Sequence, residues 1–159
     1  MSGLLIIGYG NPLRGDDGIG WRLANELDDR RDDGEVEYLS SMQLTPELAL
    51  PISHAEEVWF LDAEQGESPG AIACRKISSR KTLTEPWTHD VSPECLLRLA
   101  EDLYDSKPQA ILLTISGESF DLRESFSPAV QKSFETLSVF LLREIASIRD
   151  RKSKERPDA

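Results

Sequence analysis

Short apolar runs alternate along the chain with longer segments in which apolar residues recur at helical spacing. The runs predict five strands, at residues 4–7, 36–39, 58–61, 71–77 and 110–115. The run at 4–7 contains no polar residue, which is typical of a strand that is covered on both faces. The chain is therefore predicted to repeat strand and helix units.

Four helices are predicted between and after these strands. The first covers about residues 17–30, where apolar side chains recur every three or four positions. The other three begin at Thr45-Pro46, Ser92-Pro93 and Ser127-Pro128, each an N-cap residue followed by a proline in the first helical position.

This alternation predicts an α/β protein with three α/β/α layers and an open, mostly parallel five-stranded sheet. The link from strand 58–61 to strand 71–77 is too short for a helical crossover, which leaves room for one antiparallel pair there. We expect one domain over residues 1–148, since a chain of 159 residues buries a sizeable core. The charged segment 149–159 is expected to be a disordered tail.

Composition narrows the possible partners. The formal net charge of −11 disfavours nucleic acid as a partner. The chain has no uncharged apolar stretch long enough to span a membrane and no basic signal-peptide start, so a cytoplasmic location is the default expectation. The sequence does not specify the oligomeric state, for which a monomer is the default. Cys74 and Cys95 form no CxxC pair and are expected to be reduced thiols in or near the core.

Candidate chemistry gathers where predicted strands end. Asp16 and Asp17 follow the first strand, Asp62 follows the third, and His89 precedes the helix that begins after Ser92. In open α/β sheets, ligands bind beyond the carboxyl ends of the strands. Two carboxylates and an imidazole converging there suit nickel, zinc or cobalt better than magnesium or copper(I).

Spacing alone leaves other roles open for these residues. Asp16 or Asp17 could cap the first helix, where a carboxylate meets the positive end of the helix dipole. Asp62 could form a turn, and a lone histidine such as His89 is often a surface residue. His54 has no acidic neighbour at a strand end and is expected to lie on the surface.

The glycines after the first strand do not complete a nucleotide site. The dinucleotide fingerprint G-x-G-x-x-G has Leu13 in place of its third glycine, and no Gly-Lys-Ser/Thr is present. The aspartates would also repel a pyrophosphate. Gly66-Glu67-Ser68-Pro69-Gly70 matches the letters Gly-x-Ser-x-Gly, but it is predicted as a turn between two strands and not as the strand-to-helix elbow of a serine hydrolase. The His-Glu-x-x-His motif of the zincins is absent.

Residues 8–20, GYGNPLRGDDGIG, resemble the opening signature of the [NiFe]-hydrogenase maturation proteases, in which a strand ending in G-x-G-N leads to an acidic pair. The resemblance continues at residues 43–48 (QLTPEL), 60–63 (FLDA), 88–89 (TH), 96–100 (LLRLA) and 115–119 (ISGES), whereas Ser92-Pro93 replaces a Gly-Leu pair that several family members have. It covers roughly residues 3–148.

This resemblance implies an endopeptidase that removes the C-terminal extension of a [NiFe]-hydrogenase large-subunit precursor after nickel insertion. It implies that Asp17, Asp62 and His89 contact the metal and carry the catalysis. The nickel ion is expected to come from the precursor and to act as the recognition signal, and other divalent ions are expected to bind in vitro. The family often has Glu where this chain has Asp17.

Further roles and two alternative functions stay open at this point. Asn11 and the backbone of residues 8–10 are candidate groups for positioning a peptide substrate, and Asp16 could orient a ligand or cap a helix. The alternatives are a non-proteolytic chaperone that docks the nickel-loaded subunit and a Rossmann-like binder of small molecules.

Overall fold

The computed structural model describes residues 2–30, 35–79 and 91–155. The strands are β1 (Ser2–Tyr9), β2 (Val36–Ser41), β3 (Ala55–Gln65), β4 (Ile72–Ile77) and β5 (Gln109–Gly117). The helices are α1 (Ile19–Asp29), α2 (Ala49–Ser53), α3 (Pro93–Tyr104) and α4 (Pro128–Glu155), with short 3-10 turns η1 (Gly15–Gly18) and η2 (Pro46–Leu48). The Ser92 hydroxyl caps α3 by accepting a hydrogen bond from the amide of Cys95, as its sequence predicts.

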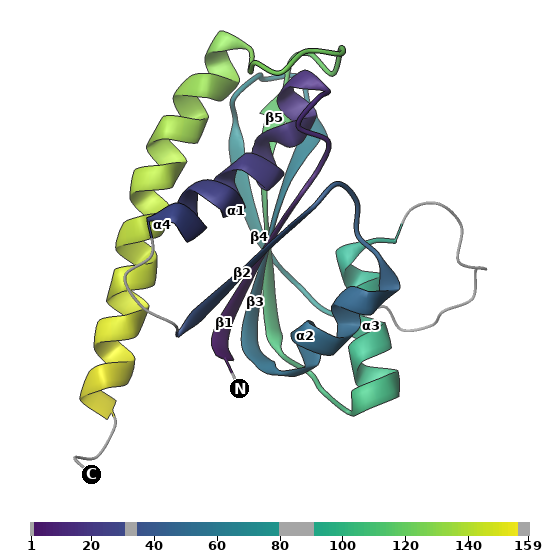
Figure 1. Cartoon of the computed structure of the whole chain (residues 1–159), viewed down its shortest axis with the longest axis vertical. Coiled ribbons are helices and arrows are strands. Elements are labelled where there is room, and N and C mark those ends of the chain that lie inside the picture. Colours follow the sequence, from purple (N-terminus) through teal and green to yellow (C-terminus); the bar gives the residue numbers. More distant parts are fainter. Residues whose placement is uncertain (1, 31–34, 80–90, 156–159) are drawn as a thin grey trace.

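The strands form one sheet in the order β2-β1-β3-β5-β4 (Figure 1). Neighbouring strands from β2 to β5 are parallel, and β4 is antiparallel to β5. The predicted fold class is thereby confirmed, including its single antiparallel pair. The expected partner was wrong, however, because β5 lies between β3 and β4 and forms a long parallel ladder with β3.

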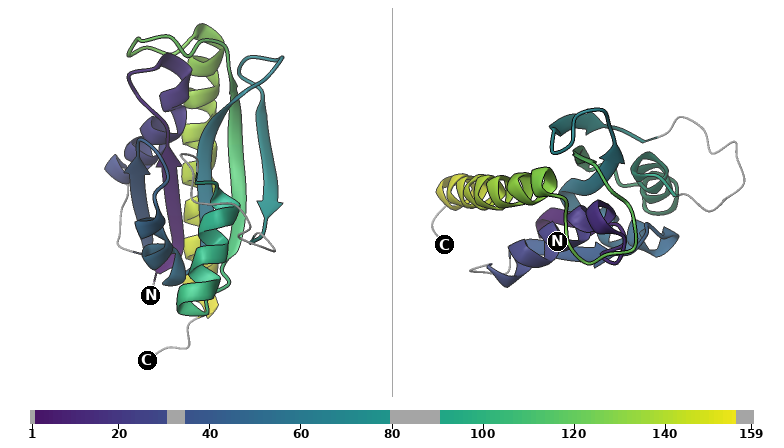
Figure 2. Two further views of the ribbon diagram at one scale, coloured as in Figure 1. Left: turned by 90° about the vertical axis from the view of Figure 1, so that its right-hand side faces the viewer. Right: turned by 90° about the horizontal axis from the view of Figure 1, so that it is seen from above.

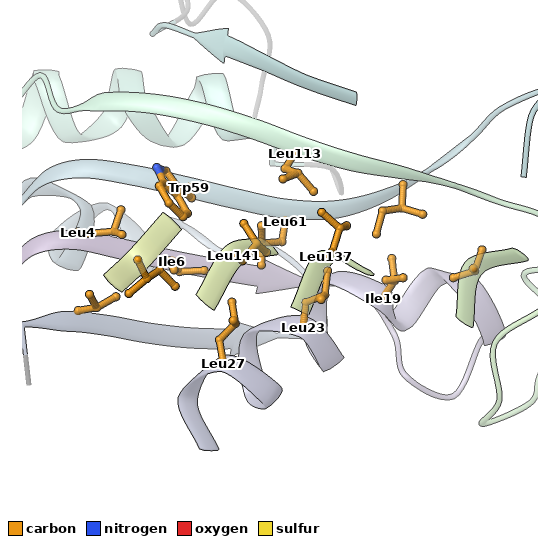
Figure 3. Packing of buried hydrophobic residues seen from close by; sticks show 14 residues of the cluster. Leu4, Ile6, Ile19, Leu23, Leu27, Trp59, Leu61, Leu113, Leu137 and Leu141 are labelled. Carbon is orange, nitrogen blue, oxygen red and sulfur yellow. The ribbon is translucent and has the colours of Figure 1, made fainter. Parts of the chain in front are cut away.

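Helices cover both faces of the sheet (Figure 2). On one face α1 and α4 pack against β1, β3 and β5 around Ile6, Leu23 and Leu141 (Figure 3). On the other face α2 and α3 pack against the same strands around Phe60, Ile52 and Leu96. Strand β3 contributes to both cores, because consecutive side chains point to opposite faces of the sheet.

Three expectations about local structure need correction. Strand β3 continues to Gln65, so Asp62 lies within the strand instead of following it. Helix α4 continues to Glu155, into the segment expected to be a disordered tail, because its Arg, Lys and Glu residues are good helix formers. Cys74 is exposed, since it lies on the edge strand β4.

None of the helices within the described ranges is long and apolar enough to cross a bilayer.

Candidate active site

The candidate site lies where the strand order reverses. From β1 the chain moves to β2 on one side, and β3 then joins β1 on the other. Such a switch point opens a crevice beyond the carboxyl ends of the two central strands. The loop that follows β1 contains Asp17, and the pairing of β1 with β3 ends at Gly8 and Leu61. Asp62 is therefore the first residue of β3 beyond that ladder.

Glycines bring α1 directly onto the two central strands. A Cβ atom on Gly20 would lie 2.1 Å from the carbonyl oxygen of Leu61, and one on Gly8 would lie 2.0 Å from that of Gly20. Gly10 has φ +133°, and a Cβ there would meet the carbonyl oxygen of Asp17. The chain's own backbone thus fills the space that side chains at Gly8 and Gly10 would need, so these glycines allow the close packing of η1 and α1. The positioning of a peptide by the backbone of residues 8–10 stays a prediction.

Asp17 is held at the entrance of α1 by the loop after β1. Its Oδ2 atom accepts a hydrogen bond of 2.9 Å from the amide of Asn11. The Asn11 side chain in turn accepts a hydrogen bond from the amide of Leu13, which shapes the loop. Asn11 is therefore a loop-forming residue that also orients Asp17, and the Oδ1 atom of Asp17 has no hydrogen-bond partner among the described residues.

Asp62 is partly buried, and its electrostatic surroundings oppose ionisation. Its Oδ1 atom accepts a hydrogen bond from the amide of Ala63 at 2.8 Å. Burial raises the pKa of Asp62 to about 6, helped by the negative charges of Asp17 and Glu64 and opposed by hydrogen bonds from Tyr9 and Ala63. The two acids that the sequence singled out, Asp17 and Asp62, therefore lie close enough for the charge of one to oppose ionisation of the other.

Tyr9 and Glu94 also belong to this part of the molecule, and sequence reasoning missed both. Burial, followed by the negative charge of Asp62, raises the pKa of the Tyr9 hydroxyl, which keeps it neutral. Glu94, in the first turn of α3, also raises the pKa of Tyr9 and forms an ion pair of 3.5 Å with Arg75 of β4. A signal for Tyr9 existed, because strand alternation puts it on the same face as Ile7.

Asp16 faces inward and binds the loop between β5 and α4. It is fully buried and accepts four hydrogen bonds of 2.7–3.0 Å, from the amides of Glu118, Ser119 and Ser127 and from the Ser127 hydroxyl. Burial opposes its ionisation, but these hydrogen bonds prevail and lower the pKa of Asp16. Asp16 thus neither caps its own helix nor faces a ligand. It joins two distant loops.

The third predicted ligand, His89, lies outside the described residues. Within the described ranges, no group of three or more His, Cys, Asp and Glu side chains is placed to hold a metal ion. The described part of the site is therefore the pair Asp17 and Asp62, and the role of His89 stays a prediction. His54 is exposed next to the amino end of β3.

Two cavities lie at the opposite edge of the sheet. Their volumes are about 500 and 330 Å³, and both are lined by the turn Lys107-Pro108-Gln109 before β5. They lie at the amino ends of the parallel strands, away from Asp17 and Asp62. Their size alone would favour them as ligand sites. Ligands of open α/β sheets bind at the carboxyl edge, however, and this is the edge at which Asp17 and Asp62 lie.

Several solved structures are similar to this chain along nearly its whole length. The [NiFe] hydrogenase maturation protease HycI from Thermococcus kodakarensis matches with a TM-score of 0.70 and 24% identity, over 89% of this chain and 91% of that one. The hydrogenase 2 maturation peptidase from Thaumarchaeota archaeon SCGC_AB-539-E09 has a TM-score of 0.67 and 23% identity, over 91% and 99% of the two chains. The hydrogenase maturating endopeptidase HybD from E. coli has a TM-score of 0.66 and 22% identity, over 94% and 93%.

The comparisons of sequence give no match, in contrast to the comparisons of structure. No family model matches the chain, and no curated protein matches it either. The structural similarity extends to the mostly parallel sheet and the helices on both of its faces. The chain therefore has the α/β fold of the solved [NiFe] hydrogenase maturation proteases.

Proposed function

We propose that the protein is an endopeptidase that removes the C-terminal extension of a [NiFe]-hydrogenase large-subunit precursor after nickel has been inserted. The observation that carries this proposal is the pair of acids at the switch point, with Asp17 in the loop after β1 and Asp62 directly beyond the β1–β3 ladder. Burial and, to a lesser extent, the charge of Asp17 raise the pKa of Asp62. The structures that share the fold are named as maturation proteases and peptidases, which supports the same reaction.

The chemistry of the acid pair fits a divalent cation. Two neighbouring carboxylates repel one another, and a cation between them removes that repulsion. Oxygen ligands from Asp17 and Asp62 with a nitrogen ligand from His89 would suit nickel. Nickel carried by the precursor would supply Lewis acidity at the scissile carbonyl or at a water molecule.

Backbone amides of the chain hold the two carboxylates in position for a cation. The amide of Asn11 fixes one oxygen of Asp17 and leaves Oδ1 available to a ligand. The amide of Ala63 fixes Oδ1 of Asp62 in the same manner. With a pKa of about 6, Asp62 exchanges its proton near neutral pH, so binding of a cation would displace that proton at low cost.

The loop after β1 argues against a nucleotide as the ligand. In a phosphate-binding loop, backbone amides at the helix entrance point toward the phosphate oxygens. Here the amide of Asn11 donates to Asp17, and the amide of Asp16 donates to the carbonyl oxygen of Ser119. The donors that a phosphate needs are therefore already used within the protein.

The direct test compares nickel-loaded and nickel-free precursor incubated with the protein, followed by mass measurement of the large subunit. We expect loss of the C-terminal peptide only from the nickel-loaded form. The variants Asp17→Asn, Asp62→Asn and His89→Ala should abolish cleavage, whereas His54→Ala should retain it. Cleavage that survives in all three site variants would overturn the metal-site assignment. An intact precursor that nevertheless binds would favour the chaperone alternative.

A further inference from the structure

The loops that carry Asp16 and Ser127 together expose an apolar and basic tip beside the candidate site. The amide of Arg123 donates to the carbonyl oxygen of Leu13 at 2.9 Å, and the amide of Gly15 donates to that of Arg123 at 2.8 Å. These bonds pair Arg14 with Arg123 as a parallel bridge. We call Leu13, Arg14, Leu122 and Arg123 the two-loop tip. It lies at the carboxyl edge of the sheet (Figure 1).

The leucines of the two-loop tip are exposed although the backbone around them is firmly held. Leu122 is 83% exposed and Leu13 is 51% exposed. The four hydrogen bonds of Asp16 fix the same two loops beneath them. Single exposed leucines are common on protein surfaces. Two on adjoining, hydrogen-bonded loops next to a candidate active site instead suggest contact with a partner, because a preorganised surface loses little entropy on binding.

The arginines of the tip are opposite one another in the bridge between the two loops. Paired residues of neighbouring strands lie about 5 Å apart, and like charges in such positions repel. Among the residues that the structure describes, the side chain of Arg14 donates only to the carbonyl oxygen of Phe120, and that of Arg123 only to the Ser125 hydroxyl. Neither guanidinium forms an ion pair with a carboxylate of the described residues. In a chain of net charge −11, both guanidinium groups thus contact only neutral oxygen atoms of the described residues.

We propose that the two-loop tip is the docking element for the folded body of the substrate protein, and that it binds an acidic surface groove with apolar walls. This proposal rests on the proposed function, because it takes the precursor as the partner. Carboxylates of the groove would compensate Arg14 and Arg123, and its apolar walls would cover Leu13 and Leu122. The loop that bears Leu13 and Arg14 leads directly to Asp17, so docking there would bring the body of the precursor next to the acid pair.

The test measures cleavage of nickel-loaded precursor by the full-length protein and its variants. In the variants R14Q/R123Q and L122S, we expect KM to rise by at least about tenfold while kcat changes little, since docking contributes equally to ground state and transition state. The matched controls are K132Q/R143Q, which removes two exposed charges from α4, and L103S, which alters an exposed leucine of α3. Both controls should retain the KM of the wild type.

Two further readouts separate docking from a structural role. The KM of the wild type should rise with salt concentration, and this dependence should be much weaker in R14Q/R123Q because the attraction between charges is screened. The melting temperature of R14Q/R123Q should change little, since both side chains are exposed and neither forms an ion pair with a carboxylate of the described residues. A lower melting temperature together with an unchanged salt dependence would overturn the docking role.

Direct binding of the precursor, measured by titration calorimetry, distinguishes this proposal from the proposed function. If the wild type and both tip variants bind the precursor with equal affinity, the docking proposal fails while the protease assignment stands. If the wild type binds the nickel-loaded precursor through the tip but never cleaves it, the protease assignment fails and the docking surface stands.

Discussion

The buried carboxylate of Asp16 accepts hydrogen bonds from both the amide and the hydroxyl of Ser127, each at 2.8 Å. Asp17, the next residue, has its carboxylate on the amide of Asn11 instead. Two consecutive acids thus have separate tasks. Asp16 holds the loop after β1 against the loop after β5. Asp17 lies at the candidate site, where its Oδ1 atom is available to a ligand.

We expect Asp16→Ala to lower the free energy of unfolding by about 3 kcal/mol or more, because it leaves several buried donors without a partner. Urea unfolding at pH 7 measures this loss. The control is Asp121→Asn, an exposed change in the same loop, which should cost much less. Because hydrogen bonds lower the pKa of Asp16, the stability it provides is present above the unfolded pKa and is lost as pH falls through the folded value. Equal stability of the two variants would contradict this role.

The raised pKa of Asp62 predicts a pH-dependent penalty on folding. Below the unfolded pKa the Asp62 carboxyl is protonated in both the folded and the unfolded protein, so it does not reduce the free energy of unfolding. Because the folded pKa is raised to about 6, stability is lost as pH rises through about 6. Asp62→Asn should therefore be more stable than the wild type at pH 8, by roughly 2–3 kcal/mol for a shift of about two pKa units.

Denaturant unfolding of both proteins from pH 4 to pH 8 tests this expectation. The difference in the free energy of unfolding between Asp62→Asn and the wild type should vanish near pH 4. The control Glu64→Gln should show a much smaller pH-dependent difference, because Glu64 is exposed and lies two residues from Asp62. A difference that is constant across the pH range would show that the titration of Asp62 is not its source.

Gly20→Ala should destabilise the protein although alanine is the better helix former. The new methyl group would lie 2.1 Å from the carbonyl oxygen of Leu61 and 2.7 Å from that of Tyr9, so α1 must move away from the sheet. We expect a loss of about 1–3 kcal/mol, in excess of the gain of about 1 kcal/mol in helix propensity. Thermal unfolding measures it. Glu26→Ala, which removes an exposed ion pair on the same helix, should change stability far less.

Nickel binding to the protein alone tests the predicted ligand set. Because a ligand that binds only the folded state raises the melting temperature, added Ni²⁺ should raise that of the wild type in a concentration-dependent manner. The chain has only two histidines, which makes His54→Ala a matched control for His89→Ala. The increase should persist in His54→Ala and should be lost in His89→Ala and Asp62→Asn. If His89→Ala keeps the full increase, His89 is not a ligand.

Local patterns were sufficient to predict most of the fold. The apolar run before Gly8, the Ser92-Pro93 cap and the spacing of apolar residues in α1 each depend on neighbours in sequence, and the structure has the corresponding elements. The position of β4 could not be predicted in this way. Its turn from β3 is short, but its partner is decided by the longer β3–β5 ladder, which joins residues far apart in the chain.

The site shows the same limit. The carboxyl-edge rule placed Asp17 and Asp62 correctly near the switch point, because that rule depends only on strand order. The role of Asp16 depends on Ser127, 111 positions away, and no local pattern specifies that contact. The same holds for Tyr9, whose surroundings include Arg75 and Glu94 from two other elements.

The distance in sequence between Asp16 and Ser127 has a consequence for how the protein is made. During synthesis the first loop emerges early, but its buried carboxylate finds its donors only after residues 118–127 have left the ribosome. Until then the loop that leads to Asp17 lacks the hydrogen bonds that join it to the loop after β5. Under the proposed function, nascent and truncated chains that have not exposed residues 118–127 are therefore expected to be inactive.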